Sequence, residues 1–300
     1  MALRLATRGS PLARWQADWV AAALGPTVDV ELVIVDTVGD RRQDVPLHVI
    51  GGQGVFVKEV QAAVLEGRAD AAVHSAKDLP SVTAPGLDLA AIGVRGDPRD
   101  ALVGSTLAGL REGGRVATGS VRRRAQLAHL RPDLEFHDLR GNIGTRLSKA
   151  SDYDAIVMAV AALRRLGADD RITEALDPEV MIPQVGQGAV AVECRSGDER
   201  TRGHLAGVDD RDTRGAVEAE RAFLAVLGGG CTLPVGAYAT RRGAALNLHA
   251  VIASEDGATC LTHREDGTDP AALGASVARH LLDVAGGRAV LGVDGTTDRP

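Results

Sequence analysis

Lys77 and Asp78 are the neighbouring residues whose types could most readily carry chemistry in this chain. They follow the short apolar run 71–76 and precede Pro80. Ligands of open α/β sheets bind just beyond the carboxyl ends of the strands, so an amine and a carboxylate there predict a ligand site. The chain has three lysines against thirty-one arginines (34 minus 3), so a lysine here stands out. A solvated strand end closed by Pro80 explains the segment equally well.

Arginines gather at turns that join predicted strands to predicted helices. One such helix carries Arg122, Arg123 and Arg124 in its first turn, directly after Thr118 and Ser120. A helix start presents free N–H groups and the positive end of the helix dipole. Three cations there oppose the helix unless an anion lies among them, so we expect an anion at this turn.

The same arrangement recurs at two further turns. Arg140 and Arg146 flank the next connection, and Arg8 ends the first strand just before Ser10. Residues 115–146 hold seven arginines against three acids, although the net charge of the chain is −6. An arginine-rich surface explains any one of these residues, but three similar turns favour a site for carboxylates or phosphates, which guanidinium groups bind in bidentate fashion.

The expected ligand carries several separated carboxylates. No P-loop pattern GxxxxGK[ST] occurs, and the glycines at 51, 52 and 54 precede a helix without a strand directly before them. A dinucleotide-binding turn is therefore weakly supported. Dispersed arginines suit spaced carboxylates better than one phosphate cluster.

Cys231 is the other residue with reactive potential. It follows three glycines, 228–230, after a predicted helix. Glycines let the backbone approach a bulky group, which predicts a thiol that attaches a group or acts as a nucleophile. A helix end with an incidental buried thiol is the simpler alternative. Cys194 and Cys260 lie in strand-like patterns, where burial is expected, and the absence of CxxC argues against disulfides and a zinc site.

Alternating strands and helices predict βαβ units with mostly parallel sheets. The turn 91–99 and the segment 183–188 indicate two crossings between a first and a second α/β lobe, and residues 39–54 indicate a long polar loop. The pattern then changes to an α+β module. Expected strands are 3–7, 28–37, 71–78, 115–118, 134–139, 154–160, 189–194, 235–240, 245–254 and 258–264. Expected helices are 10–24, 55–66, 121–131, 142–150, one that begins at about 161, 210–227 and 270–282.

Composition excludes several function classes. Aromatic residues make up 2% of the chain and the net charge is −6, so neither stacking platforms nor a basic field favours nucleic acid. Apolar runs fall short of the ~20 residues that span a bilayer. The N-terminus enters a strand-like pattern without a signal peptide. We therefore expect a soluble cytoplasmic protein that binds neither nucleic acid nor membrane.

Seven short blocks resemble, in order and over nearly the whole chain, the hydroxymethylbilane synthase (porphobilinogen deaminase) family. The blocks are Ala6-Thr7-Arg8-Gly9-Ser10-Pro11-Leu12-Ala13, Gly54-Val55-Phe56-Val57-Lys58-Glu59, His74-Ser75-Ala76-Lys77-Asp78-Leu79-Pro80, Val121-Arg122-Arg123, Leu139-Arg140-Gly141-Asn142-Ile143-Gly144-Thr145-Arg146, Val185-Gly186-Gln187-Gly188 and Gly229-Gly230-Cys231. The resemblance implies two lobes similar to type II periplasmic binding proteins and a small α+β third domain. It places domain 1 at 1–94 with 189–206, domain 2 at 98–184 and domain 3 at 210–300.

The resemblance also implies a reaction. Four molecules of porphobilinogen are joined head to tail, each losing ammonia, to give hydroxymethylbilane in porphyrin and heme biosynthesis. The family builds its product on a dipyrromethane cofactor, which a thioether would attach to Cys231 here. A monomer acting on a small-molecule substrate is expected.

Site residues follow from the matching positions. Asp78 would stabilise a cationic pyrrole nitrogen and move protons, with Lys77 beside it. The cofactor would be held by Ser75, Lys77, Asp78, Thr118, Ser120, Arg122 and Arg123. Substrate carboxylates would meet Arg8, Ser10, Arg140, Arg146 and, by position, Arg171.

Departures and rival classes remain open. Val38 and Gln53 stand where the family pattern often has basic residues, which puts closure of the loop 39–54 over a polyanion in doubt. A non-enzymatic carboxylate-binding protein would explain the lobes and the arginines, but not a third domain or the Gly-Gly-Gly-Cys turn. An acyl-transfer enzyme using Cys231 would need a paired base, and no histidine lies near it in sequence.

Overall fold

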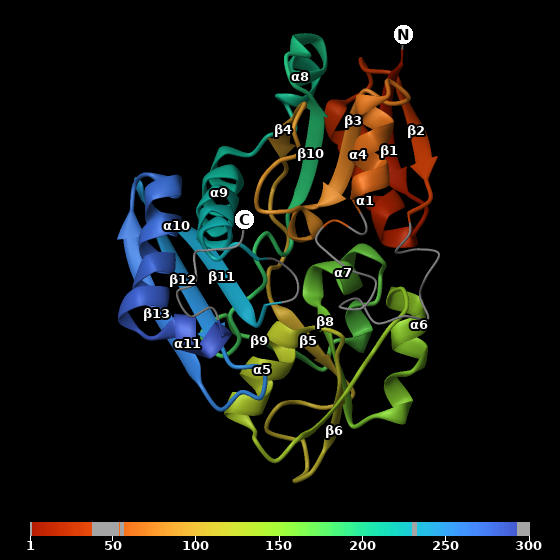
Figure 1. Cartoon of the computed structure of the whole chain (residues 1–300). Helices are drawn as coiled ribbons and strands as arrows, with labels where there is room; N and C mark the ends of the chain where they lie inside the picture. The colour runs from red at the N-terminus through yellow and green to blue at the C-terminus, as the bar shows by residue number, and fades with distance from the viewer. Residues whose placement is uncertain (1, 38–53, 55–56, 230–232, 293–300) are drawn as a thin grey trace.

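The chain forms three β-sheets, each with its own helices, in the computed structural model of the protein (Figure 1). The structure describes residues 2–37, 54, 57–229 and 233–292. Two sheets form an upper and a lower lobe, and the third lies beside their junction (Figure 1). Within the described residues, no helix is long and apolar enough to cross a membrane.

Lobe 1, the upper lobe, contains a five-stranded sheet and its covering helices. Its elements are β1 (Leu3–Arg8), α1 (Pro11–Leu24), β2 (Val30–Val35), α4 (Lys58–Leu65), β3 (Ala71–Ser75), β4 (Leu87–Ile92), β10 (Val190–Arg195) and α8 (Glu199–Leu205). The strand order is β2-β1-β3-β10-β4, with β1, β2 and β3 parallel and β10 antiparallel to both of its neighbours. The carboxyl ends of β1 and β3 therefore lie at one edge of the sheet.

Lobe 2, the lower lobe, repeats this plan. Its elements are β5 (Asp100–Val103), β6 (Arg115–Ala117), α5 (Val121–Leu130), β7 (Glu135–His137), α6 (Ile143–Ser148), η2 (Ala150–Asp152), β8 (Ala155–Ala159), α7 (Val160–Arg165), η3 (Asp169–Arg171) and β9 (Glu174–Leu176). The order is β7-β6-β8-β5-β9, with β6 parallel to β7 and β8 and with β5 antiparallel to its neighbours. β8 is buried along its whole length, as a central strand between helical layers should be.

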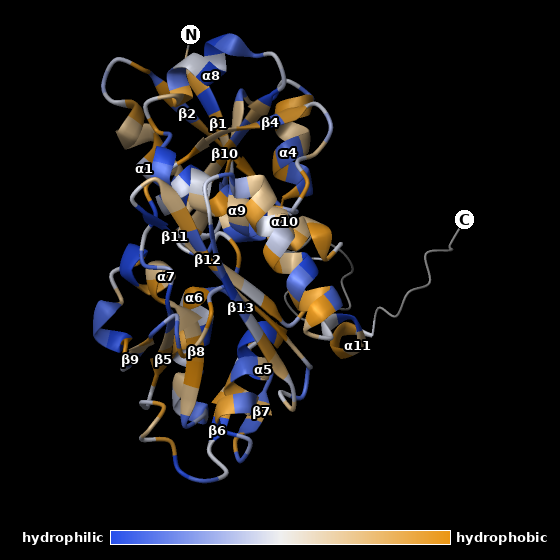
Figure 2. Cartoon of the chain, turned by 90° about the vertical axis from the view of Figure 1, so that its left-hand side faces the viewer, coloured by the Kyte–Doolittle hydropathy of each residue, from blue (hydrophilic) through white to orange (hydrophobic). Residues whose placement is uncertain are grey.

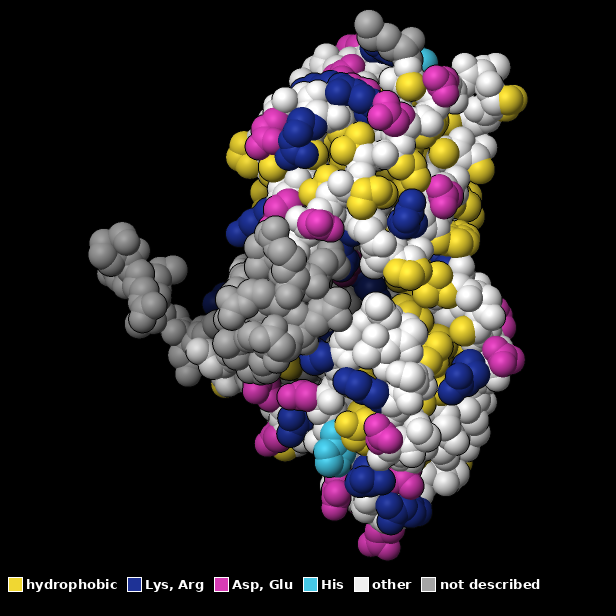
Figure 3. Space-filling model, turned by 90° about the vertical axis from the view of Figure 1, so that its right-hand side faces the viewer, with side chains coloured by type: hydrophobic (Ala, Val, Ile, Leu, Met, Phe, Trp, Pro, Cys, Tyr) yellow, Lys and Arg dark blue, Asp and Glu magenta, His cyan; other side chains and the backbone are white. Residues whose placement is uncertain are grey.

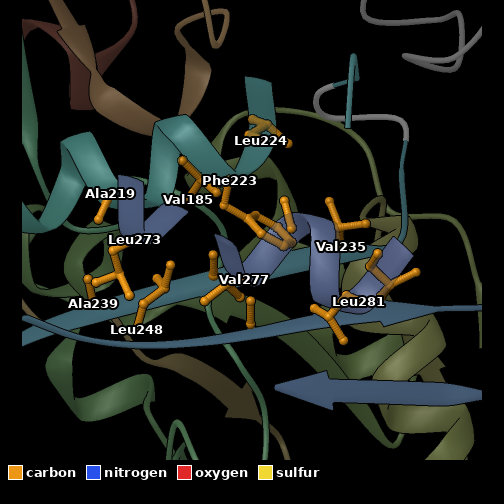
Figure 4. Packing of buried hydrophobic residues seen from close by; sticks show 14 of the residues in the cluster. Val185, Ala219, Phe223, Leu224, Val235, Ala239, Leu248, Leu273, Val277 and Leu281 are labelled. Carbon is orange, nitrogen blue, oxygen red and sulfur yellow. The ribbon is translucent and has the colours of Figure 1, made fainter. Parts of the chain in front are cut away.

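The third domain packs its helices on an antiparallel sheet. Its elements are α9 (Arg211–Val226), β11 (Val235–Arg242), β12 (Ala245–Ala253), β13 (Cys260–Gly267), α10 (Pro270–Arg279), η4 (His280–Val284) and α11 (Gly287–Leu291). Apolar side chains from α9, α10 and the sheet meet around the fully buried Phe223 (Figure 4). A Cβ on Gly274 would lie 2.2 Å from the carbonyl oxygen of Ala219, so glycine lets α10 approach α9 closely. Figure 2, viewed from the side of this domain, shows it in front of the junction of the two lobes.

Two chain segments cross between the lobes, one before β5 and one before β10, and Glu220 of α9 joins both to the third domain. Its fully buried carboxylate lies 2.5 Å from Arg95 Nη1 in the first crossing. It also accepts from the backbone N–H of Gly186 in the second crossing at 2.7 Å and from that of Ala239 in β11 at 2.8 Å. One side chain thus fixes the junction of all three units.

The structure confirms most of the expected elements but adds three strands, β4, β5 and β9. β4 occupies the start of the expected turn 91–99, so the first crossing begins after Ile92. The strand expected over 71–78 ends at Ser75, and the next residues form the 3-10 turn η1 (Ala76–Asp78). The sequence remains apolar at the start of this turn because Ala76 is buried. The Ala76 N–H also donates to the Ala189 carbonyl at 3.0 Å, which ties the turn to the second crossing.

Candidate active site between the two lobes

Lobe 1 presents a small pocket at the carboxyl edge of its sheet. Arg8 and Ser75 end β1 and β3, and Ser10 caps α1 by accepting from the Ala13 N–H at 3.3 Å. These three side chains line the pocket together with Gln16 and Asp78. Gln16 Nε2 donates to Ser75 Oγ at 2.7 Å, which fixes the hydroxyl. The structure therefore brings Arg8, Ser10, Ser75 and Asp78 to one place, as the sequence predicts.

Lobe 2 supplies basic side chains from its own strand-to-helix turns. Ser120 caps α5 by accepting from the Arg123 N–H at 3.4 Å, and Thr118 Oγ1 accepts from the Ser120 N–H at 3.2 Å. Arg146 on α6 donates from Nε to the Gly141 carbonyl at 2.8 Å. The space-filling view shows the surface drawn in between the two lobes (Figure 3).

Side chains of the two lobes meet at Gln187, whose Oε1 accepts from Lys77 Nζ of lobe 1 at 3.3 Å and from Arg123 Nη2 of lobe 2 at 3.5 Å. Burial, followed by the neighbouring charges of Arg123 and Arg140, lowers the pKa of Arg146 to about 10, while Asp78 of lobe 1 opposes this effect. Burial also lowers the pKa of Arg140. A cation whose pKa is depressed by neighbouring cations, as that of Arg146 is, favours an added anion. The cleft thus carries positive charge that a carboxylate ligand would relieve.

Arg122 and Arg123 are engaged by a carboxylate of the protein itself. Both guanidinium groups are buried and bind Asp100, the first residue of β5, through Arg122 Nη2 at 2.8 Å and Arg123 Nε at 2.9 Å. Asp100 is fully buried. The first counter-ion of these two arginines is therefore a carboxylate of the protein, Asp100, which lies outside the window 115–146.

One nitrogen of this cluster has no internal partner. Arg122 Nη1 donates to the Ile182 carbonyl at 2.7 Å, but Arg122 Nε is buried without a hydrogen-bond partner within the described structure. A buried cationic donor of this kind is costly unless it is matched. Asp100 alone leaves the arginine pair with a surplus positive charge, which fits an anionic group bound nearby.

Lys77 lies at the meeting point of the two lobes. Its amine donates to Gln187 Oε1 at 3.3 Å. Burial, followed by the positive charge of Arg123, lowers the pKa of Lys77 to about 8, and Asp78 and Asp100 oppose that effect. An amine with such a pKa gains or loses a proton near neutral pH, so its charge depends on what binds beside it.

The remaining predicted residues stand apart or lie outside the described structure. Arg171 is on η3 with an exposed side chain, and among the described residues it pairs with no acidic side chain. Cys231, Val38 and Gln53 lie outside the described residues. The chain on either side places Cys231 in the connection between α9 and β11.

Sequence reasoning missed Asp100, Gln16 and Gln187. Asp100 has no local signal because its partners are more than twenty residues away in sequence. Gln187 lies within one of the seven blocks quoted above, and that was the available signal. Gln16 faces Ser75 from the second turn of α1, a face that the helical spacing after Ser10 could have indicated.

The fold and the site together define a two-lobed α/β protein with a basic cleft between its lobes and an added α+β domain. Residues 3–203 match the family model described as porphobilinogen deaminase, dipyromethane cofactor binding domain, and residues 215–283 match the model of the C-terminal domain. The chain belongs to the porphobilinogen deaminase family.

Curated relatives are similar over nearly their full length. The chain is 50% identical over 300 residues to the porphobilinogen deaminase of Roseiflexus castenholzii, covering 96% of this chain and 98% of that protein. It is 48% identical over 288 residues to that of Acidithiobacillus ferrooxidans, covering 93% and 94%. The protein of Syntrophotalea carbinolica is 49% identical over 268 residues, covering 87% and 85%.

Proposed function

We propose that the chain is a porphobilinogen deaminase, which joins four porphobilinogen molecules head to tail with loss of ammonia to give hydroxymethylbilane. The observation that carries this proposal is the junction at which Lys77 of lobe 1 and Arg123 of lobe 2 donate to the same oxygen of Gln187, at 3.3 and 3.5 Å, in a chain about half identical to curated deaminases. A non-enzymatic binding protein is not favoured, because both family models are those of the enzyme.

Binding of the substrate rests on charge. Each porphobilinogen carries an acetate and a propionate, so a growing chain is a polyanion with spaced carboxylates. Arg8, Arg140 and Arg146 are proposed to bind these groups through charge-assisted hydrogen bonds. Ser10 is proposed to supply a neutral donor beside Arg8, and Arg171 to meet a carboxylate from the surface.

Asp78 is the proposed catalytic residue. Loss of ammonia leaves an electrophilic carbon and a cationic ring nitrogen on the substrate, and a carboxylate beside that nitrogen stabilises the charge and can accept the proton released on C–C bond formation. Asp78 lines the pocket on η1, next to Lys77. Lys77 is proposed to hold a substrate or cofactor carboxylate on one side of Asp78.

The dipyrromethane cofactor is proposed to be held by a thioether to Cys231 and to supply the anchor for chain growth. Ser75, Thr118, Ser120, Arg122 and Arg123 are proposed to hold its polar groups; the surplus positive charge of the arginine pair suits its carboxylates. The domain limits 1–94 with 189–206, 98–184 and 210–300, a cytoplasmic location and a monomeric state remain part of the proposal.

The test is the intact mass of the purified protein under denaturing conditions, compared with that of the variant Cys231→Ser. An excess mass of two deaminated porphobilinogen units in the parent, absent from the variant, is expected. Conversion of porphobilinogen to hydroxymethylbilane by the parent should accompany it. A bare polypeptide that neither gains this mass nor turns over porphobilinogen when it is added would refute the proposed function.

A further inference from the structure

Gln187 is a fully buried side chain at the centre of the junction between the lobes. Its Oε1 accepts from Lys77 Nζ of lobe 1 at 3.3 Å and from Arg123 Nη2 of lobe 2 at 3.5 Å. Its Nε2 donates to the Pro98 carbonyl at 2.7 Å and to Asp100 Oδ1 at 2.9 Å. The residue itself belongs to the second crossing and Pro98 to the first, so one carboxamide joins both crossings and both lobes.

The chemistry of the partners fixes the orientation of this carboxamide. An amide oxygen is an acceptor and an amide NH₂ is a donor. Turning the group over would place the NH₂ against the two cations Lys77 and Arg123, and the oxygen against the Asp100 carboxylate. Gln187 therefore holds the two cations at its amide oxygen and the Asp100 carboxylate at its amide nitrogen.

We propose that Gln187 is a positioning residue, which holds the Lys77 amine and the Arg123 guanidinium on one side of Asp100 and ties both to the two crossings. Gln187 need not touch the substrate for this role. The role of Gln187 in catalysis rests on the proposed function. The contacts between Lys77, Gln187 and Asp100 can be tested without any turnover.

The charge state of Lys77 is the property that Gln187 should control. The charged groups facing this amine are Asp78 on its own turn, Arg122 and Arg123 from α5, and Asp100 from β5. Both arginines disfavour the ammonium form, and both carboxylates favour it. Gln187 Oε1 adds a neutral acceptor on the favourable side, since hydrogen bonding to the charged form stabilises that form.

The chain offers a direct measurement because it has only three lysines, Lys58, Lys77 and Lys149. In protein labelled with [ε-¹³C]lysine, an NMR titration of the holoprotein follows three side-chain signals, which single Lys→Arg variants assign. Gln187→Met, which keeps the length of the side chain but removes its acceptor, should lower the apparent pKa of Lys77 by about one pH unit. Gln187→Glu, which adds negative charge, should raise it.

Gln126 provides the matched control. It is also a buried glutamine with two hydrogen bonds, both to the backbone of Ile182, at 2.8 and 3.0 Å. Gln126→Met should leave the Lys77 titration unchanged, and the exposed Lys58 and Lys149 should keep their titrations in every variant. Should Gln187→Met fail to fold, Gln187→Glu, which retains size and polarity, still reports through the opposite shift.

Activity provides the second readout. If Gln187 positions Lys77, the alkaline limb of kcat/KM should follow the NMR titration, moving to lower pH in Gln187→Met and to higher pH in Gln187→Glu. An unchanged Lys77 titration in both variants would overturn the positioning role. A parent protein that shows the shifts but neither carries the cofactor mass nor turns over porphobilinogen would refute the proposed function and leave the positioning role standing.

Discussion

Replacing Asp100 with asparagine should destabilise the folded protein by several kcal/mol. Burial alone would raise the pKa of Asp100, but the neighbouring Arg122 and Arg123 outweigh it and lower that pKa to about 2, from an ordinary value of 3.8. At 1.36 kcal/mol per pH unit, the folded state favours the ionised carboxylate by about 2 kcal/mol. Asparagine also leaves two buried guanidinium groups without their counter-ion, and breaking a buried pair in this way costs about 3–5 kcal/mol.

Urea unfolding at pH 7 measures this loss, and Asp97→Asn is the control. Asp97 lies three residues earlier in the first crossing and pairs with Arg99 and Arg164, whose side chains are 36% and 50% exposed. Ion pairs with such exposed partners contribute about 0–1 kcal/mol to the free energy of unfolding. Asp97→Asn should therefore lower that free energy by much less than Asp100→Asn does. An Asp100→Asn variant no less stable than Asp97→Asn would refute the reasoning.

The pH dependence gives the same prediction a second test. Because the folded-state pKa of Asp100 is lowered, its contribution is present above pH 3.8, the ordinary value, and is lost as the pH falls through about 2. The difference in free energy of unfolding between the parent and Asp100→Asn should therefore narrow between about pH 4 and pH 2. A difference that stays constant over this range would show that the loss at pH 7 comes from packing and not from charge.

Three further predictions concern Asp78, Arg146 compared with Arg171, and Lys77. Asp78→Asn should leave the unfolding midpoint and the cofactor mass unchanged. It should reduce turnover of porphobilinogen by about 10²–10⁴-fold, which is the usual contribution of a general acid or base. A normal kcat would remove Asp78 from the mechanism. Arg146→Leu should reduce kcat/KM at least tenfold, which corresponds to about 1.4 kcal/mol. It should not lower stability, because it removes the repulsion of Arg146 from Arg123 and Arg140. Arg171→Leu should reduce kcat/KM by less, since the side chain of Arg171 is exposed. Activity should decline as the pH rises above about 8, where Lys77 loses its proton. Lys77→Arg should move that decline to higher pH. An alkaline limb that is the same in Lys77→Arg and in the parent would show that the decline does not report Lys77.

Elements with local end signals could be predicted closely from the sequence. The helix expected over 10–24 is α1, with Ser10 as its cap and Pro11 as its first residue. The helix expected over 210–227 is α9, where Asp210 accepts from the Thr213 N–H at 2.8 Å. An N-cap bonds to a backbone N–H within three residues, so the sequence alone contains the information that sets where these two helices begin.

Strands next to the crossings could not be found in this way. β4 and β5 flank the first crossing, and their partners β10 and β8 come from residues more than fifty positions later. β5 is four residues long and begins with a charged residue, Asp100, a pattern that does not resemble a buried strand. Only the later parts of the chain, which supply Arg122 and Arg123, make burial of that carboxylate favourable.

The same non-local pairing decides how the positive charge of the site is used. The sequence pattern predicts that Arg122 and Arg123 bind a ligand, yet Asp100 already neutralises part of the charge of this pair. The charge left for a ligand is carried by Lys77, Arg140 and Arg146, whose pKa values are lowered by burial and, for Lys77 and Arg146, also by neighbouring cations. A protein anion therefore stabilises the cationic site before any ligand binds, and a bound polycarboxylate would further stabilise the charged forms of the cations whose pKa values are lowered.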